Sequence, residues 1–269
     1  MFKTRLLSGI VLVILALILI ITGGNVLFAA SLLISYVGMY ELYRVFKIEK
    51  ETPALIGYVT ATIYYINLRF TFIPDMLMLV LGCLVLLMSV YVFTYPKYKT
   101  EQIMAAFFGV FYMAVMFSYV YRTREIASGA YIVWLIFLCS WGCDTCAYCA
   151  GKLLGKHKMT PVLSPKKTVE GAIGGVLGTA VLTMLYAYVF KDAMEIDGSG
   201  MIALAIISMV GALISMVGDL AASAIKRNYD VKDYGTLIPG HGGILDRFDS
   251  VIFTAPIIYY LATTIMHLQ

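Results

Sequence analysis

Acidic and basic residues are interleaved over a short stretch near the C-terminal end of the chain. The stretch begins where a long apolar segment ends, and a charge inside a membrane costs about 2.5–3.5 kcal/mol on insertion scales. We therefore expect its first acid, Asp219, to be paired or bound to a metal ion. Asp219 begins a series of polar residues spaced i, i+4, i+7, i+8 and i+11, which would line one face of a helix. The series is Asp219, Ser223, Lys226, Arg227 and Asp230.

A glycine-rich loop follows, and it leads into the last apolar segment. Its glycines would let backbone N–H groups approach an anion closely. Asp246 and Asp249 are three residues apart and would share one helical face. Facing Asp219 from another helix, they would form the oxygen-rich kind of site that Mg²⁺ prefers, completed by water and substrate phosphates. The remaining phosphate charge would be met by Lys226, Arg227, Lys232 and Arg247.

A second polar block precedes this one. Asp144 and Tyr148 would share a helix face, and Ser164 followed by Pro165 predicts the start of a helix. Lys166 and Lys167 at that N-terminus would bind phosphate through their charge and through free N–H groups. The alternative is a basic loop on the inner side of a membrane, without a ligand.

Residues 223–249 resemble the signature of the phosphatidate cytidylyltransferases, also called CDP-diacylglycerol synthases. Residues 144–171 are similar to a second block of that family. The resemblance implies a Mg²⁺-dependent reaction of CTP with phosphatidic acid, which gives CDP-diacylglycerol and pyrophosphate for phospholipid biosynthesis. The matching elements are Ser223, Lys226-Arg227, Lys232-Asp233, His241-Gly242-Gly243, Asp246-Arg247-x-Asp249, Asp144-x-x-Ala147-Tyr148 and Ser164-Pro165-Lys166-Lys167-Thr168-x-Glu170-Gly171.

The resemblance also implies roles for these residues. Asp219 and Asp246 would hold the metal, with Asp249 as a further ligand, and a second cation is left open. We expect the catalytic groups to be Lys167, Lys226, Arg227, Lys232, Asp233 and His241. We expect the substrates to be bound by Asp144, Tyr148, Ser164, Lys166, Ser223, Gly242, Gly243 and Arg247.

The rest of the chain must hold these groups at a membrane. It is 61% hydrophobic and 13% charged, against about 25% charged residues in a soluble domain. Long continuous apolar runs predict an all-α, polytopic helical bundle rather than a barrel, including a retained first span. The nine candidate spans are 6–22, 25–44, 53–68, 74–95, 102–121, 130–150, 170–190, 200–222 and 249–267.

The distribution of Lys and Arg predicts a cytoplasmic N-terminus and a multi-pass protein of the inner (cytoplasmic) membrane, with its active site facing the cytoplasm. Both polar loops fall on that side because two spans separate them. We expect one membrane-embedded domain, 1–269, in which 130–269 carry catalysis and 1–125 have an unclear role. The small, scattered net charge of +4 does not favour nucleic acid as a partner, and a homodimer is left open.

Small residues within the spans suggest close helix packing. Glycines spaced four apart within 171–178 let helices approach each other in lipid. Cys143, Cys146 and Cys149 fit a packing role better than a metal cage, because the helical period spreads them around the helix.

Three other functions are considered. A CTP-dependent polyprenol kinase would release CDP instead of pyrophosphate. A CDP-alcohol phosphotransferase would need an Asp-rich helical motif that this sequence lacks. A transporter would place acids deep within several spans, whereas here they lie at span ends and in loops.

Overall fold

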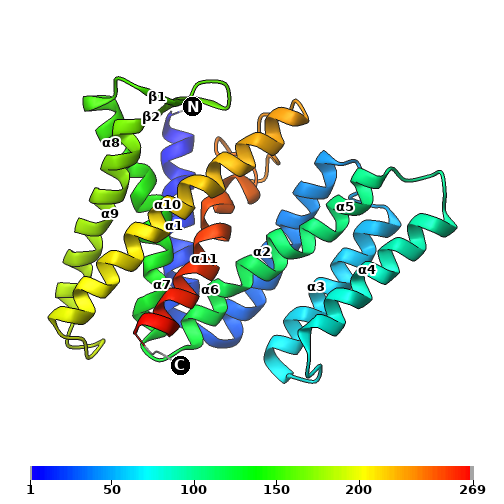
Figure 1. Cartoon of the computed structure of the whole chain (residues 1–269), viewed down its shortest axis with the longest axis horizontal. Coiled ribbons are helices and arrows are strands. Elements are labelled where there is room, and N and C mark those ends of the chain that lie inside the picture. The colour runs from blue at the N-terminus through cyan, green and yellow to red at the C-terminus, as the bar shows by residue number, and fades with distance from the viewer. Residues whose placement is uncertain (1, 267–269) are drawn as a thin grey trace. The chain divides into compact units, whose positions relative to one another are not determined.

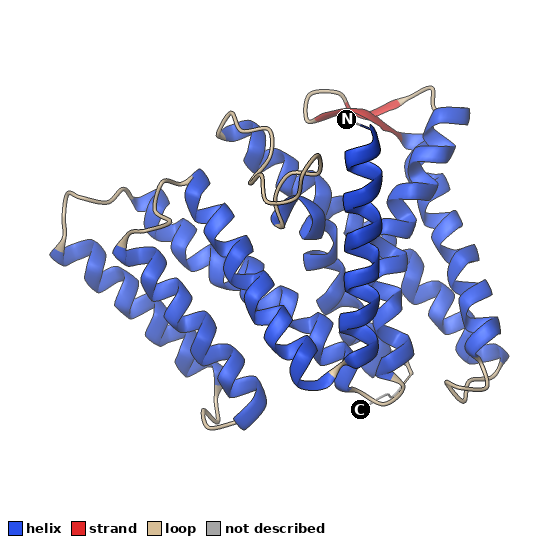
Figure 2. Ribbon diagram, turned by 180° about the vertical axis from the view of Figure 1, so that it is seen from behind, coloured by secondary structure: helices blue, strands red, loops and turns tan. Residues whose placement is uncertain are grey.

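The computed structural model describes residues 2–266, which form helices joined by short loops and one small hairpin (Figures 1 and 2). Two of the helical rods contain a π-helical turn, labelled η. In chain order, the helices are α1 (Phe2–Thr22), α2 (Gly24–Val45), α3 (Thr52–Phe70), α4 (Met76–Phe93), α5–η1–α6 (Thr100–Gly109, Val110–Val115, Met116–Glu125), α7–η2–α8 (Gly129–Phe137, Leu138–Gly142, Cys143–Leu154), α9 (Val169–Phe190), α10 (Gly198–Asn228) and α11 (Leu245–Ile265).

The predicted fold of apolar, membrane-type helices is confirmed, whereas the count of nine spans stays a prediction. Each of the nine predicted apolar stretches overlaps one continuous helical rod among the described residues. Seven of these rods are long and apolar enough to cross a membrane, and α1 contributes a shorter apolar stretch, Leu7–Thr22. A length of about 20 apolar residues matches the hydrocarbon thickness of a bilayer.

The prediction of a helix starting at Ser164 is wrong, and with it the strictly all-α description. Strand β2 (Ser164–Thr168) pairs antiparallel with β1 (Lys158–Thr160). Helix α9 starts only at Val169, because the hydroxyl of Thr168 accepts the Gly171 N–H at 3.1 Å and serves as the N-cap. Ser-Pro is a local start signal, whereas the hairpin depends on strand pairing within the loop. Lys166 and Lys167 therefore lie on a strand before the helix.

The predicted polar stripe on α10 is shorter than expected. The helix ends at Asn228, and Asp230 adopts a left-handed backbone conformation with φ 52°. The Val231 N–H donates to the Lys226 carbonyl at 3.0 Å, which closes the helix end. Asp230 therefore leaves the face that carries Asp219.

The described residues fall into two compact units, each assembled from segments distant in sequence. The first unit consists of the start of α1, most of α2, helices α3–α5 and the loop before α11. Most of α6–α10 and α11 make up the second. Within the described residues, the first unit is 2–13, Phe28–Ser118 and Asp233–Arg247, and the second is Ile14–Leu27, Tyr119–Lys232 and 248–266.

Close packing of small residues joins α8 and α9 in the second unit (Figure 1). A Cβ atom added to Gly174 would overlap the Cβ atom of Ala150, and one added to Gly178 would lie 2.7 Å from Cys146. The prediction that these glycines serve packing is confirmed. Cys143 is buried and Cys146 lies against Gly178, whereas Cys149 is exposed, and all three are free thiols.

Gly174→Ala should lower the melting temperature in detergent micelles, because overpacking costs about 1–3 kcal/mol. Adding Ala150→Gly should restore most of the loss, since it removes the atom that the new methyl group meets. Gly198→Ala is the control, because an added Cβ there meets nothing within 4 Å. A Gly174→Ala protein as stable as the wild type would contradict the packing argument.

Candidate functional site

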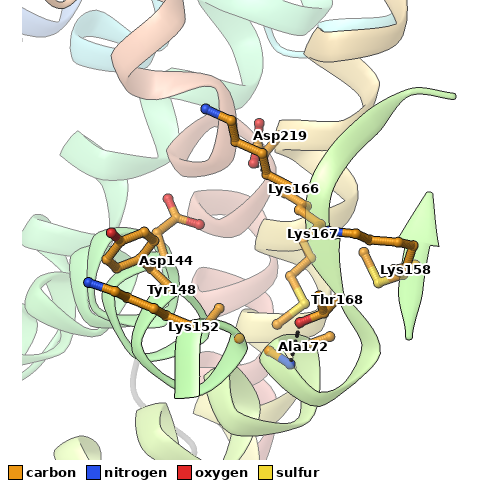
Figure 3. A pocket seen from close by; sticks show the side chains of 14 residues that line it. Asp144, Tyr148, Lys152, Lys158, Lys166, Lys167, Thr168, Ala172 and Asp219 are labelled. Atoms are coloured by element: carbon orange, nitrogen blue, oxygen red, sulfur yellow. Dashed lines mark hydrogen bonds and ion pairs between the residues drawn. The ribbon is translucent and has the colours of Figure 1, made fainter. Parts of the chain in front are cut away.

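A cavity of about 490 Å³ in the second unit brings residues of the 144–171 block together with Asp219, the first acid of the C-terminal stretch (Figure 3). This volume lies within the range of about 300–1,000 Å³ typical of ligand pockets. Helix α8 contributes one wall, the β1–β2 hairpin another, and α10 contributes an acid. The charged and aromatic lining comprises Asp144, Tyr148, Lys152, Lys158, Lys166, Lys167 and Asp219.

The charge of this cavity favours an anionic ligand. Four lysines and two aspartates line it, so the basic groups are in excess. Lysine ammonium groups act as point charges toward phosphate, and several of them can share a polyanion. The sequence blocks around Asp144, Lys167 and Asp219 thus meet at one site suited to phosphate groups.

An ion pair crosses the cavity wall from the hairpin to α10. Lys167 Nζ lies 2.5 Å from Asp219 Oδ2, and the two side chains are 25% and 28% exposed. This pairing meets the expectation that Asp219, at the end of an apolar segment, has a cationic partner. It also fixes the strand that carries Lys166 against α10.

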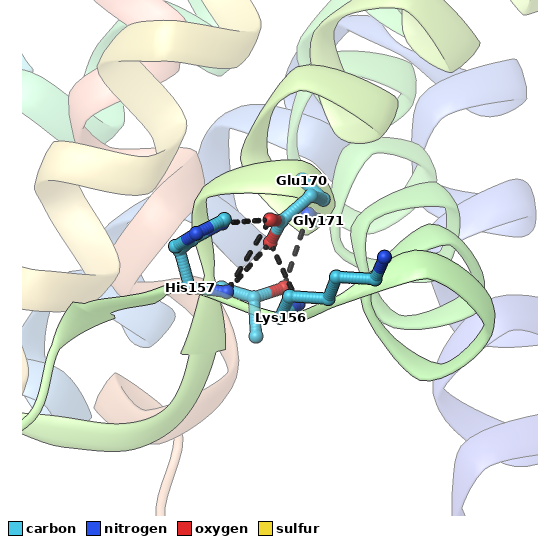
Figure 4. Close-up of polar contacts among 5 residues, drawn as sticks. Lys156, His157, Glu170 and Gly171 are labelled. Atoms are coloured by element: carbon cyan, nitrogen blue, oxygen red, sulfur yellow. Dashed lines mark hydrogen bonds and ion pairs between the residues drawn. The ribbon is translucent and has the colours of Figure 1, made fainter.

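Glu170 fastens the base of the same hairpin (Figure 4). Its carboxylate accepts the backbone N–H of Lys156 at 3.1 Å and that of His157 at 3.2 Å, and it lies 2.5 Å from His157 Nδ1. Because Glu170 stands in the first turn of α9, the helix dipole favours its negative charge. The contacts hold β1 beside the start of α9, and with it the lysines of the cavity.

Asp249 lies on α11 where this helix approaches α10. A Cβ added to Gly218 would lie 2.9 Å from the Asp249 carbonyl oxygen and 3.0 Å from Phe253, so glycine allows the approach. The Asp249 side chain is buried, accepts the Ser250 N–H at 2.8 Å, and interacts electrostatically with Asp219, Lys226 and Asp144.

This arrangement can be compared with what a metal ion requires. Among the described residues, no group of three or more His, Cys, Asp or Glu side chains is placed to hold a metal ion. Mg²⁺ in phosphate-handling sites takes one or two carboxylates and completes its shell with water and phosphate. Asp219 and Asp249 are the carboxylates that would hold such an ion, because their helices meet at Gly218 and a cation would offset the repulsion between the two charges.

The glycine-rich loop belongs to the first unit, and its amides bind the protein's own carboxylates. Asp246 is buried, and its Oδ2 accepts the N–H groups of Tyr234 at 2.8 Å and Gly243 at 3.0 Å. Gly242 has φ +86°, a conformation that glycine adopts freely. The Gly243 amide, predicted to approach a substrate anion, is therefore bound to Asp246 in this structure.

His241 of the loop contacts helix α1. Its Nδ1 lies 2.8 Å from the hydroxyl of Ser8, which also contacts the Pro239 carbonyl at 3.0 Å. The contact with the Ser8 hydroxyl orients the imidazole ring.

Several predicted residues do not line the cavity. Ser164 is the first residue of β2 and lies beside the turn of the hairpin, whereas Thr168 lies at the base of the hairpin. Ser223, Lys226 and Arg227 continue along α10 beyond Asp219, and Lys226 interacts electrostatically with Asp249. Their roles, and those of Lys232, Asp233 and Arg247 around the glycine-rich loop, stay predictions.

Sequence reasoning missed Glu41 on α2. This acid is buried, 4% exposed, and accepts the N–H groups of Ile244 at 3.0 Å and Leu245 at 2.8 Å. A lone acid inside an apolar span was the available signal. It was overlooked because its partners are backbone amides 203 and 204 residues away.

The fold and the cavity define a multi-helix membrane protein with a basic, phosphate-compatible pocket beside buried carboxylates. The chain belongs to the cytidylyltransferase family, whose model matches residues 3–265.

Curated relatives of nearly equal length agree with this assignment. Proteins named phosphatidate cytidylyltransferase from Bacillus subtilis (strain 168), Staphylococcus saprophyticus and Staphylococcus aureus (strain COL) are 31%, 32% and 35% identical to this chain. Each match covers 96% of this chain and 97–98% of the relative.

Glu170→Gln should loosen the hairpin base, because a neutral amide accepts hydrogen bonds more weakly and forms no ion pair with His157. We expect the backbone amides of Lys156 and His157 to exchange with deuterium several-fold faster. Glu195→Gln, at an exposed site, serves as the control. Unchanged exchange at both amides would show that Glu170 does not anchor the hairpin.

Proposed function

We propose that this protein transfers the cytidylyl group of CTP to phosphatidic acid, forming CDP-diacylglycerol and pyrophosphate for phospholipid synthesis. The observation that carries the proposal is the basic cavity in which Asp144, Lys167 and Asp219 meet, in a chain of the cytidylyltransferase family. The names of the curated relatives support the same two substrates.

The chemistry requires positioning more than proton transfer. A phosphate oxygen of phosphatidic acid attacks the α-phosphorus of CTP and forms the new P–O bond. The bond from that phosphorus to the bridging oxygen breaks, and pyrophosphate leaves with its electron pair. Because the attacking oxygen is already anionic near neutral pH, the protein's task is alignment and charge neutralisation.

The chain's own cations supply that neutralisation. Lys152, Lys158, Lys166 and Lys167 line the cavity and would share the negative charge of the phosphates. Asp219 holds Lys167 by an ion pair, so this ammonium group is oriented before substrate binds. Lys226 and Arg227, further along α10, are proposed to meet phosphate charge beyond the cavity.

We propose that the reaction depends on Mg²⁺, held by Asp219 and Asp249, with Asp246 one helical turn earlier on α11 as a further ligand. The ion would neutralise phosphate oxygens and help to orient the triphosphate. Asp246 is itself oriented by the amides of Tyr234 and Gly243.

The membrane placement follows from the helices. Two span-length helices, α9 and α10, separate the β1–β2 loop from the glycine-rich loop, which would place both loops on one side. We propose that this is the cytoplasmic side of the inner membrane, with a cytoplasmic N-terminus, because Lys and Arg are concentrated there. A lipid headgroup and soluble CTP could then meet at the membrane surface.

Purified protein incubated with CTP, phosphatidic acid and Mg²⁺ should form a CDP-lipid and release one pyrophosphate for each lipid converted. A γ-phosphate transfer to a lipid alcohol would release CDP instead. Chromatography of the nucleotide and lipid products separates the two outcomes. Release of CDP without any CDP-lipid would exclude the proposed reaction.

Asp219→Asn and Asp249→Asn should each lower kcat at least about a hundredfold, the scale on which a lost electrostatic contact slows catalysis. Both variants keep the size of the side chain. Asp192→Asn, an exposed residue after α9, should retain wild-type turnover. Near-normal turnover in both site variants, with wild-type melting temperatures, would refute the proposed metal ligands.

A further inference from the structure

Glu41 is a buried acid on α2 that lies outside every sequence motif considered above. Oε1 accepts the Ile244 N–H at 3.0 Å, and Oε2 accepts the Leu245 N–H at 2.8 Å. Helix α11 begins at Leu245, so these amides belong to the helix end whose N–H groups have no partner within the helix. A carboxylate is favoured there by hydrogen bonding and by the helix dipole.

The loop glycines make room for this carboxylate. A Cβ atom added to Gly235 or to Gly243 would overlap an oxygen of Glu41. For Gly243, all three of the nearest atoms belong to the Glu41 carboxylate. Its backbone is not in the left-handed region, unlike that of Gly242, so space is what requires glycine at 243. The loop is therefore shaped around Glu41.

Two carboxylates share three consecutive amides at this helix end. Asp246 accepts the Gly243 N–H, and Glu41 accepts the next two, from Ile244 and Leu245. The hydrogen bond from the Gly243 N–H to the Asp246 side chain, three residues later, is one of the two hydrogen bonds that make up a capping box. Glu41 supplies the remaining acceptors from another helix, so it fixes where α11 begins and how Asp246 is oriented.

We infer that Glu41 is a positioning residue that sets the first turn of α11, and through it the carboxylates of Asp246 and Asp249. Glu41 does not line the cavity, so it would act without touching substrate. This inference rests on the proposed function for its catalytic consequence, whereas the anchoring of the loop can be tested without any substrate.

Hydrogen–deuterium exchange of the purified, substrate-free protein tests the anchor. Glu41→Gln keeps the side-chain size but turns an NH₂ group toward one of the two donors. We expect the segment containing Gly243, Ile244 and Leu245 to exchange at least tenfold faster. Glu101→Gln, an exposed acid at the start of α5, is the matched control. Wild-type exchange in Glu41→Gln would overturn the anchor.

Steady-state kinetics test the catalytic consequence. Glu41→Gln should lower kcat at least tenfold and change the KM for CTP less than threefold. It should also raise the Mg²⁺ concentration for half-maximal rate at least threefold, a shift that simple loss of folded protein would not cause. Faster exchange with unchanged kcat and Mg²⁺ dependence would overturn the positioning role. Inactive wild-type protein would instead refute the proposed function and leave the exchange result valid.

A double-mutant cycle adds a second, independent measurement. Gly243→Ala should lower kcat strongly in the wild type, because the methyl group displaces the Glu41 carboxylate. In a Glu41→Ala background the same change should cost at least fivefold less, since the overlapping atoms are gone. Additive losses would overturn the claim that Gly243 exists to admit Glu41. If Glu41→Ala fails to fold, the Glu41→Gln measurements still decide the proposal.

Discussion

Acids that are shielded from water at the ends of apolar helices need partners inside the protein, and three such acids find them in two ways. Asp219 pairs with Lys167, while Asp246 and Glu41 bind backbone amides. An unpaired carboxylate near lipid would be costly, so these contacts stabilise the fold and fix the orientation of the charged groups together. Charges held in this way can meet phosphate with little reorganisation.

The parts of the site that sequence could predict are those specified by local spacing. The helical period placed Asp144 with Tyr148, and the apolar runs located the helices, because both patterns are properties of a short stretch of chain. The sequence predicted Lys167 as a phosphate-binding group and Asp219 as an acid that needs a partner, but it did not predict that they would pair with each other. The structure shows this pairing.

The features that sequence reasoning missed depend on partners distant along the chain. The β1–β2 hairpin replaced the expected helix start at Ser164, because pairing between strands outweighed a local Ser-Pro signal. The glycine-rich loop was expected to bind substrate phosphate, but its Gly243 amide binds Asp246. The sequence did not identify Glu41 as a functional residue, because no residue near it in sequence indicates that its partners are the amides of Ile244 and Leu245.

The π-helical turn η2 has a consequence for the geometry of the cavity. It interrupts the rod just before Asp144, and within it the Ser140 hydroxyl donates to the Ile136 carbonyl at 2.7 Å. Such a turn accommodates one residue more than a regular helix, which rotates everything after it by about 100° relative to what came before. The apolar face of α7 and the cavity-lining face of α8 therefore point in different directions around the axis of one continuous rod. Removing a single residue from η2 would turn Asp144 and Tyr148 away from the cavity while leaving the helix unbroken.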